Sequence, residues 1–295
     1  MNTPIIKIIF TLVILNTVFS DLIIPEDNRF VLLTSLYNET NLDRISEYII
    51  CLEANLRNKM IKKIHVMYDN SKDDDECILF NYLMKRKVII KPINKRPTYE
   101  DCFNLSNLLY PNSKIIISNA DIYFDETLNL LSNYNLTNIF IGLTRWNINI
   151  NETPTLYHKL SQDSWIFCTP IKKFKSDFEL GVLGCDNALI DHVKSNNFIT
   201  INPCLSIKTY HLQLSGIRNY SKEHTIKCRP GYNPLDHSYL YKRSLEQDIN
   251  TLNKGIELYN KYKAYSLEWQ AYNYAIKNDL KEMADLILTL IKPIT

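Results

Sequence analysis

The chain has 295 residues, 45% of them hydrophobic, with 34 basic and 32 acidic side chains and a formal net charge of +2. This length holds one large globular domain, or a domain of about 200 residues with an appendage. The balanced charge predicts no nucleic-acid-binding face, which needs a strong excess of basic residues. Only 6 residues are glycine, and their positions form neither a G-x-G-x-x-G fingerprint nor a Walker loop. Dinucleotide-binding Rossmann enzymes and P-loop NTPases are therefore excluded.

The N-terminal segment predicts entry into the secretory pathway. Residues 1–20 carry one lysine, Lys7, followed by an apolar run over residues 8–15. This run has the length of a signal-peptide core and is short for a membrane span. Cleavage is expected after Ser20, with an uncleaved membrane anchor as the alternative. Five N-x-S/T sequons fit a secreted or lumenal glycoprotein, at Asn38, Asn104, Asn135, Asn151 and Asn219.

The seven cysteines contain no C-x-x-C pair, which excludes the common zinc ribbons. An oxidising compartment would allow some of them to form disulfides. Because their number is odd, at least one thiol is expected to stay free or to pair with another chain.

The first half of the chain alternates between two apolar patterns. Compact apolar runs of strand length lie at residues 30–36, 64–68, 88–90 and 115–117. Helical spacing or helix-start chemistry follows the first three, at residues 41–56, 73–84 and 97–109. Alternation at this spacing predicts an α/β fold with a mostly parallel sheet sandwiched by helices.

The second half is more mixed. Strands are expected at residues 138–143, 164–167 and 198–202, and a helix at residues 185–195. From about residue 237 the spacing becomes helical. We therefore expect one domain over residues 21–236, followed by a helical C-terminal extension over residues 237–295 that packs on the domain or on a partner.

Asp121 is the first candidate for a functional side chain. It follows the strand at residues 115–117, and ligands of open α/β sheets bind beyond the carboxyl ends of the strands. A metal or substrate contact is therefore expected. The alternative, a helix cap before Glu126, suits Asp125 better than Asp121.

Two further candidates lie in the second half. Gly181 and Gly184 precede Asp186 at the start of a helix, so Asp186 either caps this helix or points into a cleft as a general base. His211 follows an alternating stretch. It is either a structural residue or a metal ligand whose partners are carboxylates distant in sequence.

In order along the chain, these segments resemble glycosyltransferases of the GT-A type, and more narrowly a set of poorly characterised glycosyltransferase-like proteins. The resemblance covers roughly residues 29–221, about two-thirds of the chain, and its specificity lies in the ordered set of segments. It implies a GT-A-like, Rossmann-like fold. The matching segments read FVLLTSLYNET, IHVMYD, SNADIYFD, SQDSWIF, GVLGCDN and INPCLSIKTYHLQLSGIRNY.

The resemblance also implies a divalent cation, manganese or magnesium, that is held by a D-x-D element and bridges the diphosphate of a nucleotide sugar. Here the element reads Asn119-Ala120-Asp121, so its first carboxylate is missing. Asp121 would bind the metal, and His211 would complete the metal shell. Asn119 would be a neutral ligand or a contact to the sugar nucleotide.

Further roles follow from the same resemblance. The loop from Ser35 to Glu39 would pass over the uridine or guanosine, Asp69 would meet the base, and Asp186 would deprotonate the acceptor hydroxyl. Basic residues are available as secondary phosphate contacts: Lys208, Arg218 and Arg145. The indoles of Trp146 and Trp165 either offer flat faces to a sugar or pack in the core.

The sequence thus predicts a secretory-pathway glycosyltransferase of the hexosyltransferase type, with a nucleotide-sugar donor and a glycan, protein or lipid acceptor. The alternative is a catalytically silent glycosyltransferase-like scaffold that binds a glycan or a protein partner. A hydrolase is a weaker third hypothesis, since the chain has no G-x-S-x-G element.

Overall fold

The computed structural model describes residues 28–71, 77–148, 153–213, 215–216 and 225–240. Several sequence predictions lie outside these residues. They are the signal segment, the sequons at Asn151 and Asn219, the acidic helix start at residues 73–76, the phosphate contact Arg218 and nearly all of the C-terminal extension.

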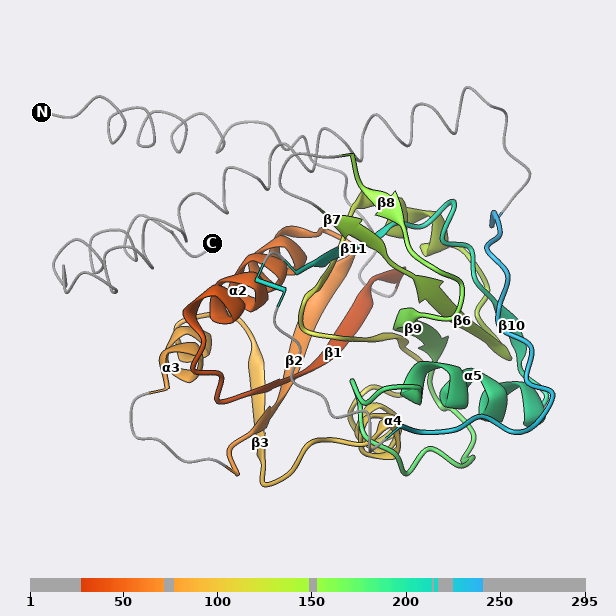
Figure 1. Ribbon diagram of the computed structural model, residues 1–295, viewed down its shortest axis with the longest axis horizontal. Coiled ribbons are helices and arrows are strands. Elements are labelled where there is room, and N and C mark those ends of the chain that lie inside the picture. Colours follow the sequence, from red (N-terminus) through yellow and green to blue (C-terminus); the bar gives the residue numbers. More distant parts are fainter. Residues whose placement is uncertain (1–27, 72–76, 149–152, 214, 217–224, 241–295) are drawn as a thin grey trace, which may run out of the picture.

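A seven-stranded main sheet forms the centre of the described chain (Figure 1). Six of its strands run in the same direction, and the seventh, β9, lies antiparallel between β4 and β6. The mostly parallel α/β sheet expected from the sequence is therefore confirmed. In spatial order the strands are β10 (Ile199–Ile201), β6 (Ile139–Thr144), β9 (Gln162–Cys168), β4 (Lys114–Ser118), β1 (Phe30–Tyr37), β2 (Ile61–Asp69) and β3 (Ile89–Ile93).

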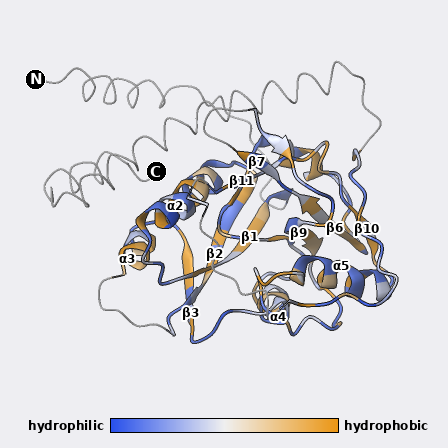
Figure 2. Cartoon of the chain, viewed as in Figure 1, coloured by the Kyte–Doolittle hydropathy of each residue, from blue (hydrophilic) through white to orange (hydrophobic). Residues whose placement is uncertain are grey.

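Helices cover both faces of the main sheet. On one face lie α2 (Leu42–Arg57) and α3 (Ile78–Met84), and on the other lie α4 (Tyr99–Leu109) and α5 (Cys185–Ser195). Because side chains alternate along a strand, Phe30 of β1 packs with α2, and Val31 packs with α4 and α5. Strands buried on both faces are apolar at consecutive positions, as at the start of β1, which has mainly the hydrophobic colour in Figure 2.

Side-chain caps mark the starts of two of the helices expected from the sequence. The side chain of Asn41 accepts a hydrogen bond from the backbone N–H of Arg44 at the start of α2, and Thr98 forms a capping box with Asp101 at the start of α4. Helix α5 has the predicted bounds. Asp125 caps the short 3-10 helix η2 (Glu126–Leu131), as the sequence suggested.

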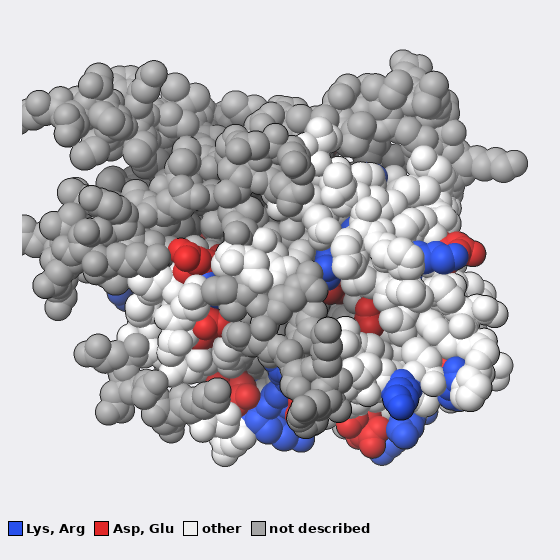
Figure 3. All heavy atoms as spheres, in the orientation of Figure 1, with Lys and Arg blue, Asp and Glu red and all other residues white. Residues whose placement is uncertain are grey.

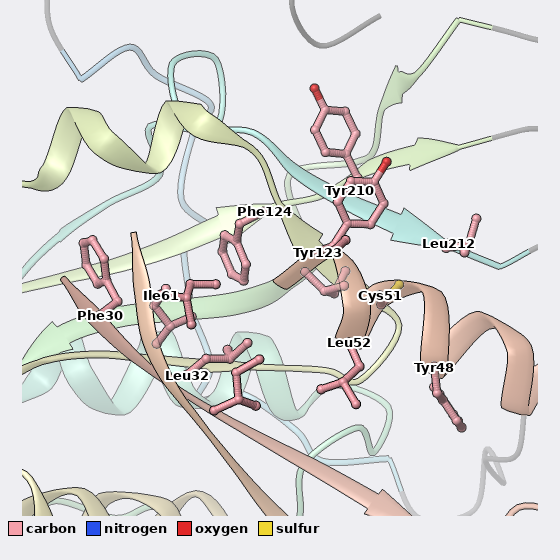
Figure 4. Close-up of a cluster of buried hydrophobic side chains, with 14 of the residues drawn as sticks. Phe30, Leu32, Tyr48, Cys51, Leu52, Ile61, Tyr123, Phe124, Tyr210 and Leu212 are labelled. Atoms are coloured by element: carbon pink, nitrogen blue, oxygen red, sulfur yellow. The ribbon is translucent and has the colours of Figure 1, made fainter. Parts of the chain in front are cut away.

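A smaller sheet of four strands was not expected from the sequence. It consists of β5 (Ile122–Phe124), β11 (Thr209–Leu212), β7 (Trp146–Ile148) and β8 (Thr155–Leu156). It packs on the same face of the main sheet as α2. The rings of Tyr123 and Tyr210 stack with centroids 5.1 Å apart, beside Cys51 and Leu52 of α2 (Figure 4).

Two general features concern the thiols and the helices. All seven cysteines are free thiols, so the disulfides that an oxidising compartment would allow are not formed in the structure. Among the helices of the described residues, none has both the length and the apolar character needed to cross a membrane.

Asn55 joins the smaller sheet to α2. Its buried amide donates to the carbonyl of Ile122 at 2.9 Å and accepts from the backbone N–H of Phe124 at 3.0 Å. The side chain therefore pairs with β5 as a neighbouring strand would. This contact fixes β5, and with it the preceding residue Asp121, against the helix.

We predict that Asn55→Leu lowers the free energy of unfolding by about 2–4 kcal/mol, because two buried backbone groups lose their partners. Urea unfolding followed by circular dichroism measures the change. The matched control is Asn81→Leu on the exposed side of α3, which should alter stability by less than about 0.5 kcal/mol. Equal losses in the two variants would contradict the structural role of Asn55.

Candidate active site

A cleft of about 530 Å³ opens at the carboxyl edge of the main sheet. The parallel strands β1 and β4 both end at this edge, and Ser35 and Asn119 line the cleft there. Because β9 is antiparallel, it begins at the same edge, and the backbone N–H of Asn119 donates to the carbonyl of Asp163 at 3.1 Å. A volume of this size suits a small-molecule ligand.

Asp121 lies in the cleft wall between β4 and β5, with a side chain only 9% exposed. Its Oδ2 accepts a hydrogen bond from Nη2 of Arg44 at 2.5 Å and lies 3.3 Å from Nε2 of His211. The antiparallel pairing of β11 with β5 sets His211 opposite Ile122. The structure thus brings together the two residues that the sequence assigned to a metal.

The ionisation of Asp121 reflects these neighbours. Burial alone would raise the pKa of its carboxyl group, but the charges and hydrogen bonds of His211 and Arg44 hold this pKa well below its usual range. Asp121 is therefore a carboxylate throughout the neutral pH range. Its Oδ1 is buried and has no hydrogen-bond partner among the described residues.

Arg44 is a cleft residue that the sequence did not single out. Its Nη1 donates to Glu47 at 2.7 Å, its Nε donates to the hydroxyl of Tyr48 at 3.1 Å, and its Nη2 holds Asp121. Burial would lower the pKa of the guanidinium, but these partners, Asp121 foremost, raise it above its usual value. One sequence signal was available: a positive charge in the first turn of a helix opposes the helix dipole and so calls for a partner.

Asp186 lies in the first turn of α5 and also lines the cleft. Its Oδ2 accepts from the backbone N–H of Gln162 at 3.3 Å, and its Oδ1 accepts from that of Asn187 at 2.9 Å. Burial, and then the charge of Asp163, raise its pKa to about 7. The N-cap position belongs to Gly184 at φ 84°, so capping alone does not account for Asp186.

Gly184 is needed for more than its backbone angle. A Cβ atom there would lie 2.2 Å from the carbonyl oxygen of Ile226. The close approach packs the segment around Ile226 against the turn that delivers Asp186.

Asp163 is a second cleft residue missing from the sequence prediction. Nη1 of Arg145 lies 2.8 Å from its Oδ2, and the amide of Asn119 donates to its Oδ1 at 2.8 Å. The segment SQDSWIF belongs to the resemblance, but the antiparallel direction of β9 is what carries Asp163 to the cleft. Asp163 precedes the apolar residues of β9 in the sequence. It lies at the carboxyl edge of the sheet because β9 runs antiparallel to its neighbours.

Two other predicted contacts do not line the cleft. Asp69 ends β2 beside Tyr37 of β1 and accepts from the backbone N–H of Ser71 at 3.0 Å. The ammonium of Lys208 lies 3.7 Å from the ring centroid of Trp146, and its backbone N–H donates to Thr127. Lys208 therefore fastens the start of β11 to η2, and it is not among the residues that line the cleft.

The two tryptophans have different surroundings. The indole of Trp165 is fully buried, and its ring centroid lies 4.9 Å from that of Tyr99. Core packing, one of the two alternatives for this residue, describes its contacts. Trp146 is half-buried, donates from its indole N–H to the carbonyl of Cys204 and carries the Lys208 ammonium on its face.

The described residues do not fit a metal ion held by the protein alone. In the described ranges no group of three or more His, Cys, Asp or Glu side chains is placed to hold a metal. Asp121 and His211 are two donors, and the carboxylate oxygen nearest His211 is already bound by Arg44. The amide of Asn119 is directed at Asp163. The metal expected at Asp121 and His211 therefore has only these two protein donors among the described residues, and the cation found at Asp121 is Arg44.

Comparison with known proteins gives likenesses of fold only. No family model matches the chain, and no curated protein is significantly similar to it. Among solved structures, the mannosyltransferase PcManGT from Pyrobaculum calidifontis, in complex with GDP-Man and Mn²⁺, is 12% identical, with 98% of this chain and 92% of that chain covered and a TM-score of 0.42.

Two further structures are similar at the same level. S. aureus TarS is 14% identical with a TM-score of 0.39; the match covers 63% of this chain but only 37% of TarS. The 4-diphosphocytidyl-2C-methyl-D-erythritol synthase of Anaerococcus prevotii is 17% identical, with 69% and 95% covered and a TM-score of 0.36. At these low scores the likenesses assign neither an activity nor a ligand to this chain.

We predict that Asp163→Asn lowers the pKa of Asp186 from about 7 toward its ordinary value, because a neighbouring like charge is removed and Arg145 loses its partner. Titration of the Asp186 carboxyl carbon by NMR measures the shift. The exposed Asp177→Asn serves as a control, since Asp177 does not line the cleft. An Asp186 pKa that stays near 7 in Asp163→Asn would show that burial alone sets it.

Proposed function

We propose that this chain is a glycosyltransferase of the hexosyltransferase type, which moves a sugar from a nucleotide-sugar donor to an acceptor hydroxyl. The observation that carries the proposal is the position and ionisation of Asp186. It is a carboxyl group with a pKa of about 7 in a cleft at the carboxyl edge of an α/β sheet. A general base works best when its pKa lies near the operating pH.

The donor is assigned to the side of the cleft built by β1, β4 and α2. Ser35, Asn119 and Asp121 line this part, and Arg44 in the first turn of α2 lines it as well, so a cation faces the donor here. The resemblance places the nucleoside beside Ser35 and its base near Asp69.

The acceptor is assigned to the side built by α5. Helix α5 packs on the opposite face of the main sheet from α2, so Asp186 faces the donor across the cleft. In the reaction the acceptor oxygen bonds to the anomeric carbon and its proton passes to Asp186. The bond from that carbon to the diphosphate breaks, and its electron pair leaves with the nucleoside diphosphate.

The compartment and the alternative function remain proposals as well. The secretory pathway rests on the N-terminal apolar segment. A silent scaffold is favoured by Asn119, which stands where the resemblance expects a carboxylate. Binding of UDP or GDP in calorimetry without release of nucleoside diphosphate from any donor would support the scaffold.

We predict that Asp186→Asn lowers the rate of nucleoside diphosphate release from a reactive donor by roughly 10²–10⁴-fold. The panel would be UDP-glucose, UDP-galactose, UDP-N-acetylglucosamine and GDP-mannose. Binding of UDP or GDP should change little, since Asp186 lies on the acceptor side. The exposed Asp177→Asn provides the matched control and should keep full activity.

The pH dependence tests the same base. The base acts as a carboxylate, whose fraction grows as pH rises through its pKa. In the native chain kcat/KM should therefore rise with pH to a plateau, with an apparent pKa of about 7. Activity that falls across this range, or an Asp186→Asn variant with native rates, would remove Asp186 from the mechanism.

A further inference from the structure

Arg44 is held in one orientation by three partners. Glu47, Tyr48 and Asp121 accept from three different nitrogens of its guanidinium, and the side chain is only 12% exposed. These contacts use three of its five N–H donors. The residue also lines the cleft, so its charge is fixed at the wall before any ligand arrives.

The charged side chains that line the cleft are matched in number. Three arginines line it, Arg44, Arg96 and Arg145, against the three carboxyl groups of Asp121, Asp163 and Asp186. Asp186 is about half protonated near neutral pH. On the described face drawn in Figure 3, basic and acidic side chains are intermixed, so binding of an anion depends on individual cations within the cleft.

Of the arginines with known partners, Arg44 is the one on the donor side. Arg145 is directed at Asp163 and at Asn147, to which its Nε donates at 3.0 Å, and it lies over the ring of Tyr157. Arg44 instead projects from the first turn of α2, where the helix dipole adds positive potential. It shares Asp121 with His211, which is the position that the resemblance gives to a metal.

We propose that Arg44 takes the place of the divalent cation and binds the diphosphate of the donor, so that nucleotide binding by this chain needs no metal ion. The inference rests on the proposed function. As the sugar–diphosphate bond breaks, the departing diphosphate gains the electron pair of that bond. A guanidinium already fixed beside it stabilises this charge without reorganisation. Its planar fork also suits phosphate oxygens better than an ammonium does.

Asp121 and Glu47 act as positioning residues in this arrangement. Their carboxylates compensate the charge of a largely buried guanidinium and fix its plane. The hydroxyl of Tyr48 adds a third fixed point, and the Arg44 guanidinium lies 4.7 Å from the centroid of the Tyr48 ring.

The first test uses the native full-length chain. Calorimetry would measure the binding of UDP and of GDP with EDTA present and with millimolar Mn²⁺ present. We expect the two dissociation constants to agree within about threefold, less than 1 kcal/mol. Binding that appears only with Mn²⁺ would overturn the role of Arg44 and leave the proposed function standing. No binding under either condition would overturn the proposed function itself.

The second test changes the cation. Arg44→Lys keeps a positive charge and lessens the danger of misfolding, yet it should weaken UDP or GDP binding in EDTA by about tenfold or more, since the fork geometry is lost. The control is Arg57→Lys in the last turn of the same helix, near Glu53, which should bind as the native chain does. Native affinity in a folded Arg44→Lys, checked by its thermal midpoint, would contradict the proposal.

Discussion

The buried ion pair between Arg44 and Asp121 joins the elements that form one side of the cleft. Arg44 comes from α2, and Asp121 comes from the junction of β4 and β5. The carbonyl of Asp121 also accepts from the backbone N–H of Leu212, which ties β11 to the same point. Removing one member of such a pair leaves a buried charge without compensation. The same contact therefore holds the two sheets and the helix in register and sets the charge that a ligand meets.

The direction of β9 determines the other side of the cleft. A parallel strand at this place would have its last residues at the carboxyl edge of the sheet. Because β9 is antiparallel, its first residues lie there. Asp163 then lies beside Asn119, and the backbone of Gln162 lies beside Asp186. Three carboxyl groups in one cleft thus have different surroundings. Asp121 and Asp163 each face an arginine, and Asp186 has a pKa near 7. Such a separation of carboxyl environments is how one site supplies both fixed charge and a base.

The main sheet and its helices could be predicted from the sequence because each signal is local. Apolar runs mark the buried strands, and Asn41, Thr98 and Asp125 mark helix starts by side-chain caps. The smaller sheet could not be predicted in this way. Its strands have two to four residues, which is too short for an alternating pattern, and they depend on partners far along the chain.

The residues of the site divide in the same way, into those with a local sequence signal and those that depend on distant parts of the chain. Asp121, Asp186 and His211 stand next to recognisable strand ends and turns, and the structure places all three along one cleft. Arg44 and Asp163 depend on tertiary information: the first on which helix end meets Asp121, the second on the direction of β9. Lys208, expected as a phosphate contact, has its ammonium over the ring of Trp146 and does not line the cleft. A basic residue near a predicted site is thus a weak signal until its neighbours are known.

The amide of Asn119 links these observations. It donates to Asp163 at 2.8 Å, and Asp163 also faces Arg145. A carboxylate at position 119 would lie against the carboxylate of Asp163, with no hydrogen to share and a direct repulsion between like charges. An amide at position 119, where the resemblance expects a carboxylate, is therefore matched to the neighbouring aspartate. Together with Arg44 on Asp121, it gives a cleft whose charges are balanced by its own side chains, and such a cleft has less need of an exchangeable ion.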